Sequence, residues 1–428
     1  MMTRTSLTMV AATLALVYCM PQVRADSEFP IATTSGREFG LMAAFDGTNY
    51  LVGIQGDQTH HANVTAQLVS QIGTLIGPRI STGRQGGTPS VAFDGANYLL
   101  VWEDDVVGPD SDIYGQFIST MGVIVGPAFS ISEAPGKQGA DPVRIAFGTT
   151  DYLVVWTDCR HSAGATGPRY VYGQLVSKYG GHVGGEIKIS AEPGCCPDVA
   201  FDGTNFLVVW VEETNRTDYY GQFVSQSGSL AGQSFIIEAN GFESDYFTVV
   251  LFDGTRYIVT IQDQIAPDEQ GYYVRFVDKD GGVSATRITL YEGKTVTGCY
   301  VPAFDGRDYL ALLSEGSEGS AIAVKGRFYD GTFSAVDDWF TIFEALGSKV
   351  PVAPYAIFGG EKYLTVAARV RLNDYDDWFR DGDVYGAFIN PRHSVCTTDI
   401  PGDINGDCRV DFEDFRIMAA HWLDDSSP

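Results

Sequence analysis

Oxygen-bearing side chains recur at alternate positions in residues 403–414, DINGDCRVDFED. The first, third, fifth, ninth and twelfth positions are Asp403, Asn405, Asp407, Asp411 and Asp414, and the main-chain carbonyl of Arg409 falls at the seventh. Oxygen ligands with this spacing converge on a hard cation such as Ca²⁺. A solvated acidic tail is the alternative. The spacing favours a calcium-binding loop, and residues 415–423 after it are expected to form a short helix.

A second set of carboxylates recurs six residues after the aromatic residue of a repeated phrase, FDGTNY. The seven equivalent positions hold Gly56, Asp104, Asp158, Glu212, Asp263, Glu315 and Arg369. A ring of five carboxylates would focus negative potential and attract a cation or a polycation. The alternative is a structural role at the end of a strand. We favour the structural role, because a residue type that recurs at the same position of most repeats usually serves the structure of the repeat.

Tryptophan also recurs, at Trp102, Trp156 and Trp210, four residues after the same aromatic residue. Indole rings can stack on sugars, but large aromatic side chains more often pack in a core. The sequence therefore favours packing over a sugar platform at these three positions.

Six cysteines follow residue 25, an even number that suits an exported, disulfide-bonded chain: Cys159, Cys195, Cys196, Cys299, Cys396 and Cys408. We predict that Cys159 pairs with Cys195 or Cys196 and that Cys396 pairs with Cys408. The histidines do not fall into metal-ligand spacing with these cysteines.

Familiar catalytic patterns do not occur in the sequence. It contains no G-x-S-x-G, no H-E-x-x-H, no phosphate-binding loop and no dinucleotide-binding glycine pattern. Two of its many carboxylates could act as a glycosidase pair, but no spacing singles out two of them. The sequence therefore predicts no catalytic residue and no organic cofactor.

A repeat of about fifty residues must position these groups. The phrase AFDGxNYLVVW returns seven times, with its first Phe at intervals of 48, 54, 54, 51, 52 and 54 residues. A second phrase follows in each repeat, clearest as IYGQF at 113–117 and YYGQF at 219–223, and a third phrase, GxxxGxxFxIS, is clearest at 122–132 and 228–237. Asp-Gly marks a tight turn, and the apolar run after it suits a strand that is covered on both faces. Four strands in each repeat predict an all-β fold, a seven-bladed β-propeller of four-stranded antiparallel blades.

The two ends of the repeat region favour a closed ring over an open solenoid. The seventh repeat lacks its FxIS phrase, whereas residues 29–32, FPIA, match that phrase ahead of the first repeat. We predict that the N-terminal strand is the outermost strand of the last blade, where it covers an open sheet edge. The long loops at residues 158–170, 263–271 and 369–383 then share one face, the loop face. Loops are where binding residues concentrate.

Residues 403–423 resemble one repeat of a type I dockerin, a calcium-dependent module that docks onto cohesins in secreted bacterial assemblies. The resemblance implies Ca²⁺ ligand roles for the residues of the 403–414 loop and a cohesin-like or cell-surface protein as partner. Dockerins carry two such repeats and a Gly at the sixth loop position, whereas this chain carries one repeat and Cys408. The propeller phrases also resemble repeats of uncharacterised secreted bacterial proteins.

The first 25 residues are typical of a signal peptide, with Arg4 ahead of an apolar run and Val23-Arg24-Ala25 as a cleavage site. We expect residues 26–392 to form the propeller and 393–428 a calcium-binding tail with a loop-helix fold. No later segment is long and apolar enough to span a membrane. The net charge of −26 opposes binding to nucleic acid.

These observations predict a secreted or extracellular monomer, at a bacterial cell surface or in the periplasm. We expect a non-enzymatic binding or surface-assembly protein that recognises carbohydrate or protein through its loop face. An extracellular carbohydrate-active hydrolase on the same scaffold is the alternative.

Overall fold

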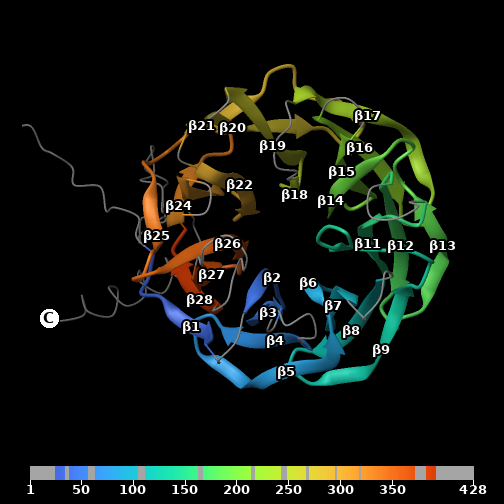
Figure 1. Ribbon diagram of the computed structural model, residues 1–428, viewed down its shortest axis with the longest axis horizontal. Coiled ribbons are helices and arrows are strands. Elements are labelled where there is room, and N and C mark those ends of the chain that lie inside the picture. The colour runs from blue at the N-terminus through green and yellow to red at the C-terminus, as the bar shows by residue number, and fades with distance from the viewer. Residues whose placement is uncertain are drawn as a thin grey trace, which may run out of the picture.

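The computed structural model describes residues 25–33, 38–55, 63–104, 111–161, 167–213, 217–241, 248–266, 269–294, 296–317, 320–371 and 382–391. These residues form seven four-stranded antiparallel sheets arranged as blades around a central axis (Figure 1). The predicted all-β, seven-bladed propeller is therefore confirmed. The calcium loop, its expected helix and the signal peptide lie outside the described residues, apart from Ala25.

The strands of blades 1 to 4, from innermost to outermost, are β2 (Phe39–Phe45), β3 (Asn49–Gln55), β4 (Asn63–Ser70), β5 (Leu75–Gln85); β6 (Gly87–Phe93), β7 (Asn97–Asp104), β8 (Asp112–Ser119), β9 (Ile124–Ser132); β10 (Arg144–Phe147), β11 (Asp151–Asp158), β12 (Tyr170–Ser177), β13 (His182–Lys188); and β14 (Gly194–Phe201), β15 (Asn205–Glu213), β16 (Thr217–Ser225), β17 (Leu230–Gly241).

Blades 5 to 7 continue the pattern with β18 (Val249–Phe252), β19 (Tyr257–Ala266), β20 (Glu269–Val277), β21 (Ile288–Gly293); β22 (Val296–Phe304), β23 (Tyr309–Ser317), β24 (Ser320–Tyr329), β25 (Phe340–Glu344); and β26 (Lys349–Phe358), β27 (Tyr363–Arg371), β28 (Gly382–Ile389), β1 (Phe29–Ala32).

The N-terminal strand closes the ring as the sequence predicts. β1 pairs antiparallel with β28, with Phe29 opposite Gly386 and Pro30 opposite Tyr385. Pro30 is exposed on this edge, where a missing N–H breaks no ladder hydrogen bond. Blade 7 is thus assembled from both ends of the propeller sequence.

The turn between the first two strands explains the repeated FDGxN phrase. In blade 2 a carboxylate oxygen of Asp94 accepts hydrogen bonds from the main-chain N–H groups of Ala96 and Asn97, each at 2.7 Å. Gly95 has a φ of 91°, which a residue with a side chain adopts only at a cost. Because this turn is copied, the same edge of most blades lies on one face of the ring.

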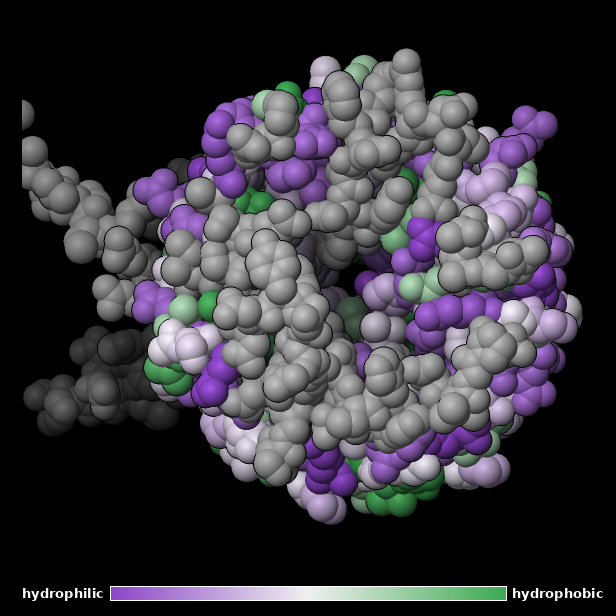
Figure 2. Space-filling model, viewed as in Figure 1, coloured by the Kyte–Doolittle hydropathy of each residue, from purple (hydrophilic) through white to green (hydrophobic). Residues whose placement is uncertain are grey.

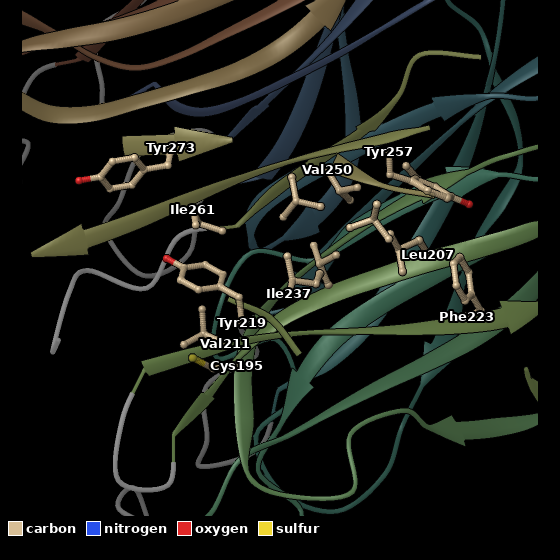
Figure 3. Close-up of a cluster of buried hydrophobic side chains, with 14 residues drawn as sticks. Cys195, Leu207, Val211, Tyr219, Phe223, Ile237, Val250, Tyr257, Ile261 and Tyr273 are labelled. Atoms are coloured by element: carbon tan, nitrogen blue, oxygen red, sulfur yellow. The ribbon is translucent and has the colours of Figure 1, made fainter. Parts of the chain in front are cut away.

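Buried side chains fill the spaces between neighbouring blades. Figure 3 shows the cluster between blades 4 and 5, where Leu207 and Phe223 meet Val250 and Tyr257. The second strand of each blade is apolar on both faces because each face contacts another layer of the ring; β11 is buried at every residue except its first, Asp151.

The YGQF phrase ties the third strand to the outermost one. The side-chain amide of Gln116 donates hydrogen bonds to the carbonyl oxygens of Phe117, Val125 and Gly126 at 3.1, 3.2 and 3.1 Å. The pairing of β8 with β9 shifts register at this point, so the amide satisfies carbonyl groups near the irregularity. Gln67, Gln174 and Gln222 repeat this contact in blades 1, 3 and 4.

We expect the substitution Gln116→Leu to lower the free energy of unfolding by about 1–3 kcal/mol, because it leaves buried carbonyl groups without a donor. Urea denaturation measures the change. The exposed Gln233 on β17 offers the control, and Gln233→Leu should change stability little. Equal effects of the two substitutions would contradict the bridging role of Gln116.

Candidate functional site

The five predicted carboxylates lie at equivalent ends of the second strands. In register, Asp104 stands opposite Asp112, Asp158 opposite Tyr170 and Asp263 opposite Gly271, each beside the start of the third strand. Glu212 and Glu315 occupy the same place in blades 4 and 6. The structure therefore brings all five to the loop face, on five consecutive blades.

Most of these carboxylates contact a cationic side chain. Arg84, from the end of the outermost strand of blade 1, donates from Nε to Asp104 of blade 2 at 3.0 Å. The other ion pairs are Asp158 with Arg160 at 2.6 Å, Asp263 with Arg287 at 2.8 Å and Glu315 with Lys325 at 2.7 Å. Glu212 hydrogen-bonds to the hydroxyl of Tyr220. Four of the five carboxylates are therefore paired with a cation, which favours the structural interpretation of the ring over a cation site.

The arginines of this ring also lie over tyrosine rings. The guanidinium of Arg84 stands 3.7 Å from the ring centre of Tyr114, and that of Arg287 stands 3.7 Å from Tyr273. Cation–π contact adds to the ion pair and fixes the guanidinium in place. Burial, the largest single influence, lowers the pKa of Arg84. The hydrogen bond and the charge of Asp104 outweigh it together with smaller contributions, so the pKa is raised overall. At the loop face of blades 2 and 5, an arginine thus forms an ion pair with a carboxylate and also packs on a tyrosine ring.

The repeated tryptophans pack inside the blades. Trp102 and Trp156 are fully buried and Trp210 is 3% exposed. The indole N–H of Trp156 donates to Asp158 at 2.9 Å, and the indole of Trp210 stacks on Tyr220. The packing interpretation is confirmed, and these rings are not surface platforms for sugars.

A different set of residues, five of the seven polar, lies at the axis, on the innermost strands. We compare one position of the innermost strand in every blade. It pairs with the residue of the second strand that lies three places after the Tyr or Phe of the FDGxNY phrase, as Ser90 pairs with Val101 three places after Tyr98. Its seven occupants, which we call the axial ring, are Met42, Ser90, Arg144, Asp198, Val249, Tyr300 and Tyr355. The innermost strands surround the axis, and Figure 2 shows a hollow at the centre of the face in view.

Four members of the ring form what we call the axial cluster: Arg144, Asp198, Tyr300 and Tyr355. Nε of Arg144 lies 3.7 Å from a carboxylate oxygen of Asp198 on the next blade. The other carboxylate oxygen of Asp198 accepts the main-chain N–H of Val250 at 2.8 Å. Electrostatic interactions with Arg144 reach both tyrosines, which belong to blades 6 and 7. Residues of four blades are thus coupled around the axis.

Burial controls the protonation of this cluster. It raises the pKa of the Asp198 carboxyl above its usual range, against the opposing effect of Arg144 and two main-chain N–H groups. It also raises the pKa of Tyr355 to about 12, with a smaller contribution from Asp198. At neutral pH both tyrosines therefore keep their hydroxyl protons, and the partly exposed Tyr355 can donate a hydrogen bond to a ligand.

The axial cluster offers recognition more readily than hydrolysis. Arg144 can donate paired hydrogen bonds, Asp198 can accept them, and the partly exposed Tyr355 adds aromatic surface and a hydroxyl group. Glycoside hydrolysis ordinarily needs two carboxyl groups across the scissile bond. The residues of the seven innermost strands include one carboxylate, Asp198.

This cluster is not among the sites that the sequence predicts. One signal was present: the third residue before the closing Phe is apolar or Ser in several repeats but Arg144 and Asp198 in the third and fourth. The two tyrosines gave a weaker signal. A β-bulge between Tyr300 and Ala303 displaces Tyr300 by one residue relative to the repeat.

The cysteines gather in part as expected. Cys195 and Cys196 lie at the start of β14, on the loop face. Burial is the main cause that raises the pKa of the Cys159 thiol, and the nearby Asp141 carboxylate adds to the increase. The structure shows no disulfide at Cys159, Cys195, Cys196 or Cys299. A disulfide from Cys159 to the pair therefore stays a prediction. Cys396 and Cys408 lie outside the described residues, as do all proposed calcium ligands.

In the part of the chain that the structure describes, no helix has the length and hydropathy needed to cross a membrane.

Comparisons with known proteins give structural likenesses at low sequence identity. No family model and no curated protein matches the chain. A Dyadobacter fermentans protein of unknown function is 10% identical, with a TM-score of 0.47 over 87% of this chain and 100% of its own. A neuraminidase-like N10 protein of a bat influenza A virus is 8% identical, with a TM-score of 0.42 over 86% of this chain and 100% of its own. The β-propeller domain of the Pyrococcus furiosus Trilobed protease is 10% identical, with a TM-score of 0.40 over 65% and 77%. With all three scores below 0.5, none of these likenesses bears on the function of this chain.

Proposed function

We propose that this chain is an exported, non-enzymatic binding protein that holds a carbohydrate or a protein segment at the axis of its propeller. The observation that carries the proposal is the axial cluster, in which a cation, a carboxylate and two aromatic hydroxyl groups from four blades occupy equivalent register positions. A binding site of this kind needs a few convergent polar groups on a rigid frame.

Several features support binding over turnover. The loop-face carboxylates are engaged by Arg, Lys or Tyr partners, and the innermost strands carry the single carboxylate Asp198. Sugar hydroxyl groups match Arg and Asp as hydrogen-bonding partners, and a sugar ring can pack against tyrosine. Hydrolysis remains the competing function and is separated by experiment.

The test combines a glycan array with a hydrolysis screen on the same glycans, using the full-length protein. We expect selective binding without turnover. Turnover that a single carboxylate substitution abolishes would contradict the proposal and support the hydrolase alternative.

Variants locate the site. Arg144→Ala removes a charged donor and is expected to weaken ligand binding by roughly 10–100-fold, since a hydrogen bond to a charged group contributes about 1.5–3 kcal/mol. It also leaves Asp198 buried without its cation, so Tyr355→Phe, which keeps the ion pair, is the companion variant.

Arg256→Ala is the matched control for the arginine substitution. Arg256 sits beside the Asp253 turn, at the opposite end of the blade from the loop face, and stacks on Phe276. Its removal should leave ligand affinity unchanged. If Arg144→Ala and Tyr355→Phe bind as the parent does while Arg256→Ala does not, the axial assignment is wrong.

We propose further that residues 393–428 bind Ca²⁺ and attach the propeller to a cohesin-like or cell-surface partner. The ligand spacing from Asp403 to Asp414 supports this role. Calcium titration of the full-length protein should give a heat signal that the double substitution Asp403→Ala and Asp414→Ala removes. A signal that survives both substitutions would place the calcium elsewhere.

A further inference from the structure

Two adjacent cysteines and one carboxylate meet at the loop face where blades 3 and 4 adjoin. The sulfur atoms of Cys195 and Cys196 lie 3.2 Å apart. A carboxylate oxygen of Asp141, from the segment ahead of β10, and these two sulfur atoms all lie within 4.8 Å of one another. Cys195 is fully buried, whereas Cys196 is partly exposed, so one side of the group faces outward.

The backbone holds Cys196 in an uncommon conformation. Its φ of 56° lies in the left-handed region, which residues with a side chain rarely adopt. Its N–H donates to the hydroxyl oxygen of Thr157 at 3.1 Å, and its carbonyl accepts the hydroxyl of Thr248 on blade 5. Strain of this kind persists only when neighbouring groups fix it, and it clusters at functional sites. Three blades therefore fix the position of the Cys196 thiol.

The charges around the three groups suit a divalent cation. Nη1 of Arg169 lies 3.4 Å from Asp141 and orients its carboxylate. Two thiolates and one carboxylate carry three negative charges, and Arg169 with a divalent ion would balance them. An outer residue that holds a ligand carboxylate in this way is typical of metal sites.

We propose that Cys195, Cys196 and Asp141 bind a thiophilic divalent cation of the zinc class, with one coordination position left open. Two sulfur ligands and one oxygen ligand fit Zn²⁺, which binds thiolate at about 2.3 Å in tetrahedral geometry. Two sulfur atoms on such an ion lie roughly 3.8 Å apart. The observed separation of 3.2 Å is shorter, so the two sulfur atoms would have to move apart when the ion binds. The hard, all-oxygen calcium loop of residues 403–414 differs from this site in chemistry and place.

The binding test uses the full-length protein, reduced and stripped of metal, and titrates it with Cd²⁺ as a probe for zinc-class ions. Thiolate–Cd²⁺ bonds give an ultraviolet charge-transfer band that oxygen ligands do not give. We expect the band to saturate at one ion per chain. Competition with Zn²⁺ should remove it, and excess Ca²⁺ should leave it unchanged.

Variants decide which residues bind the ion. Cys196→Ser should abolish the band, and Asp141→Asn, which keeps both thiols, should weaken binding roughly 10–100-fold. Cys299→Ser is the matched control, because Cys299 is a buried free thiol in another blade. The double variant Cys396→Ser and Cys408→Ser tests the remaining tail cysteines. Both controls should bind as the parent does.

Three results would overturn the metal site: no band in the reduced protein, a band that persists in Cys196→Ser, or loss of the band in the tail variant. Cysteine mapping of the exported protein adds a fourth. The metal site and the disulfide that the sequence predicts from Cys159 to Cys195 or Cys196 exclude each other, because a disulfide at either residue, or between the two, would remove a thiolate that the ion needs. Ligand binding at Arg144 is measured separately, so failure here leaves the proposed function standing.

Discussion

Raising the pH from about 9 to about 11 is expected to unfold the propeller, because a ring of buried tyrosines must keep its hydroxyl protons in the folded state. The Tyr or Phe of each FDGxNY phrase contacts the turn between the first two strands of the preceding blade. Tyr98 donates to the carbonyl of Asn49 at 2.9 Å, and Tyr363 donates to that of Asp308 at 3.0 Å. Tyr50 donates to Lys362 at 3.1 Å and so continues the series across the closure of the ring.

Burial raises the pKa of these hydroxyl groups, with turn carboxylates adding to the shift at Tyr98, Tyr152, Tyr257, Tyr309 and Tyr363, and Glu361 adding to it at Tyr50. Because the folded-state pKa lies above the unfolded value of about 10, their contribution to stability is complete below pH 10 and is lost as the pH rises.

The expected loss is large. Above pH 10 the unfolded chain releases protons that the folded chain keeps, and each tyrosine then lowers the free energy of unfolding by about 1.4 kcal/mol per pH unit. Six tyrosines give about 8 kcal/mol per unit, which is comparable with the whole stability of a typical domain. Urea denaturation between pH 8 and 11.5, with tyrosinate absorbance recorded in parallel, measures the slope, and ionisation should coincide with unfolding.

Tyr98→Phe sharpens this test. It should lower stability by about 0.5–1.5 kcal/mol at neutral pH, where a hydrogen bond is lost, and raise stability relative to the parent near pH 11. Blade 4 already carries Phe206 at this position, packed beside Gly148, so the site accepts phenylalanine. Tyr179, which is 91% exposed, is the control, and Tyr179→Phe should leave the slope unchanged. Equal stability at pH 8 and pH 11 would refute the tyrosine ring.

Removal of residues 26–33 is expected to lower the free energy of unfolding by about 5 kcal/mol, because it uncovers the edge of blade 7. Ile31 is buried and Phe29 stacks on Phe388, and each apolar side chain of this size contributes about 1.5–3 kcal/mol. Glu28 also forms an ion pair with Arg369. Thermal unfolding of the truncated and the intact chains measures the loss.

A point variant separates strand pairing from chain length. Ile31→Asp places a carboxylate in the core between blades 7 and 1 and should approach the effect of the deletion, whereas substitution of the exposed Pro30 by Ala should have little effect. A synthetic peptide of residues 26–33 should restore part of the lost stability. A melting temperature unchanged by the deletion would contradict closure by this strand.

Much of the fold was predictable because a copied phrase imposes a copied burial pattern. Asp94 and Gly95 show the local cause, a turn that the sequence FDGAN specifies within a few residues. Closure was predictable because one strand phrase was missing at one end and present at the other. The loop-face position of Asp158 followed from the same register.

Contacts between blades could not be predicted, because their two members are far apart in the sequence. Arg84 contacts Asp104 across a blade boundary, and Arg144 meets Asp198 from a separate repeat. Tyr300 enters the axial ring through a β-bulge between Tyr300 and Ala303, which no sequence pattern marks. Tyr355 stands three residues before Phe358, at the ordinary position of the repeat. Departures from the repeat, rather than the repeat itself, mark the candidate site.

Hydrogen exchange of the full-length protein, with and without a glycan or peptide selected on the array, tests the proposed site most directly. The account predicts that added protection is concentrated on the innermost strands β10 and β14, around Arg144 and Asp198, and on the facing segments around Tyr300 and Tyr355. Protection confined to the outermost strands or to residues 393–428, with the axis unchanged, would contradict it.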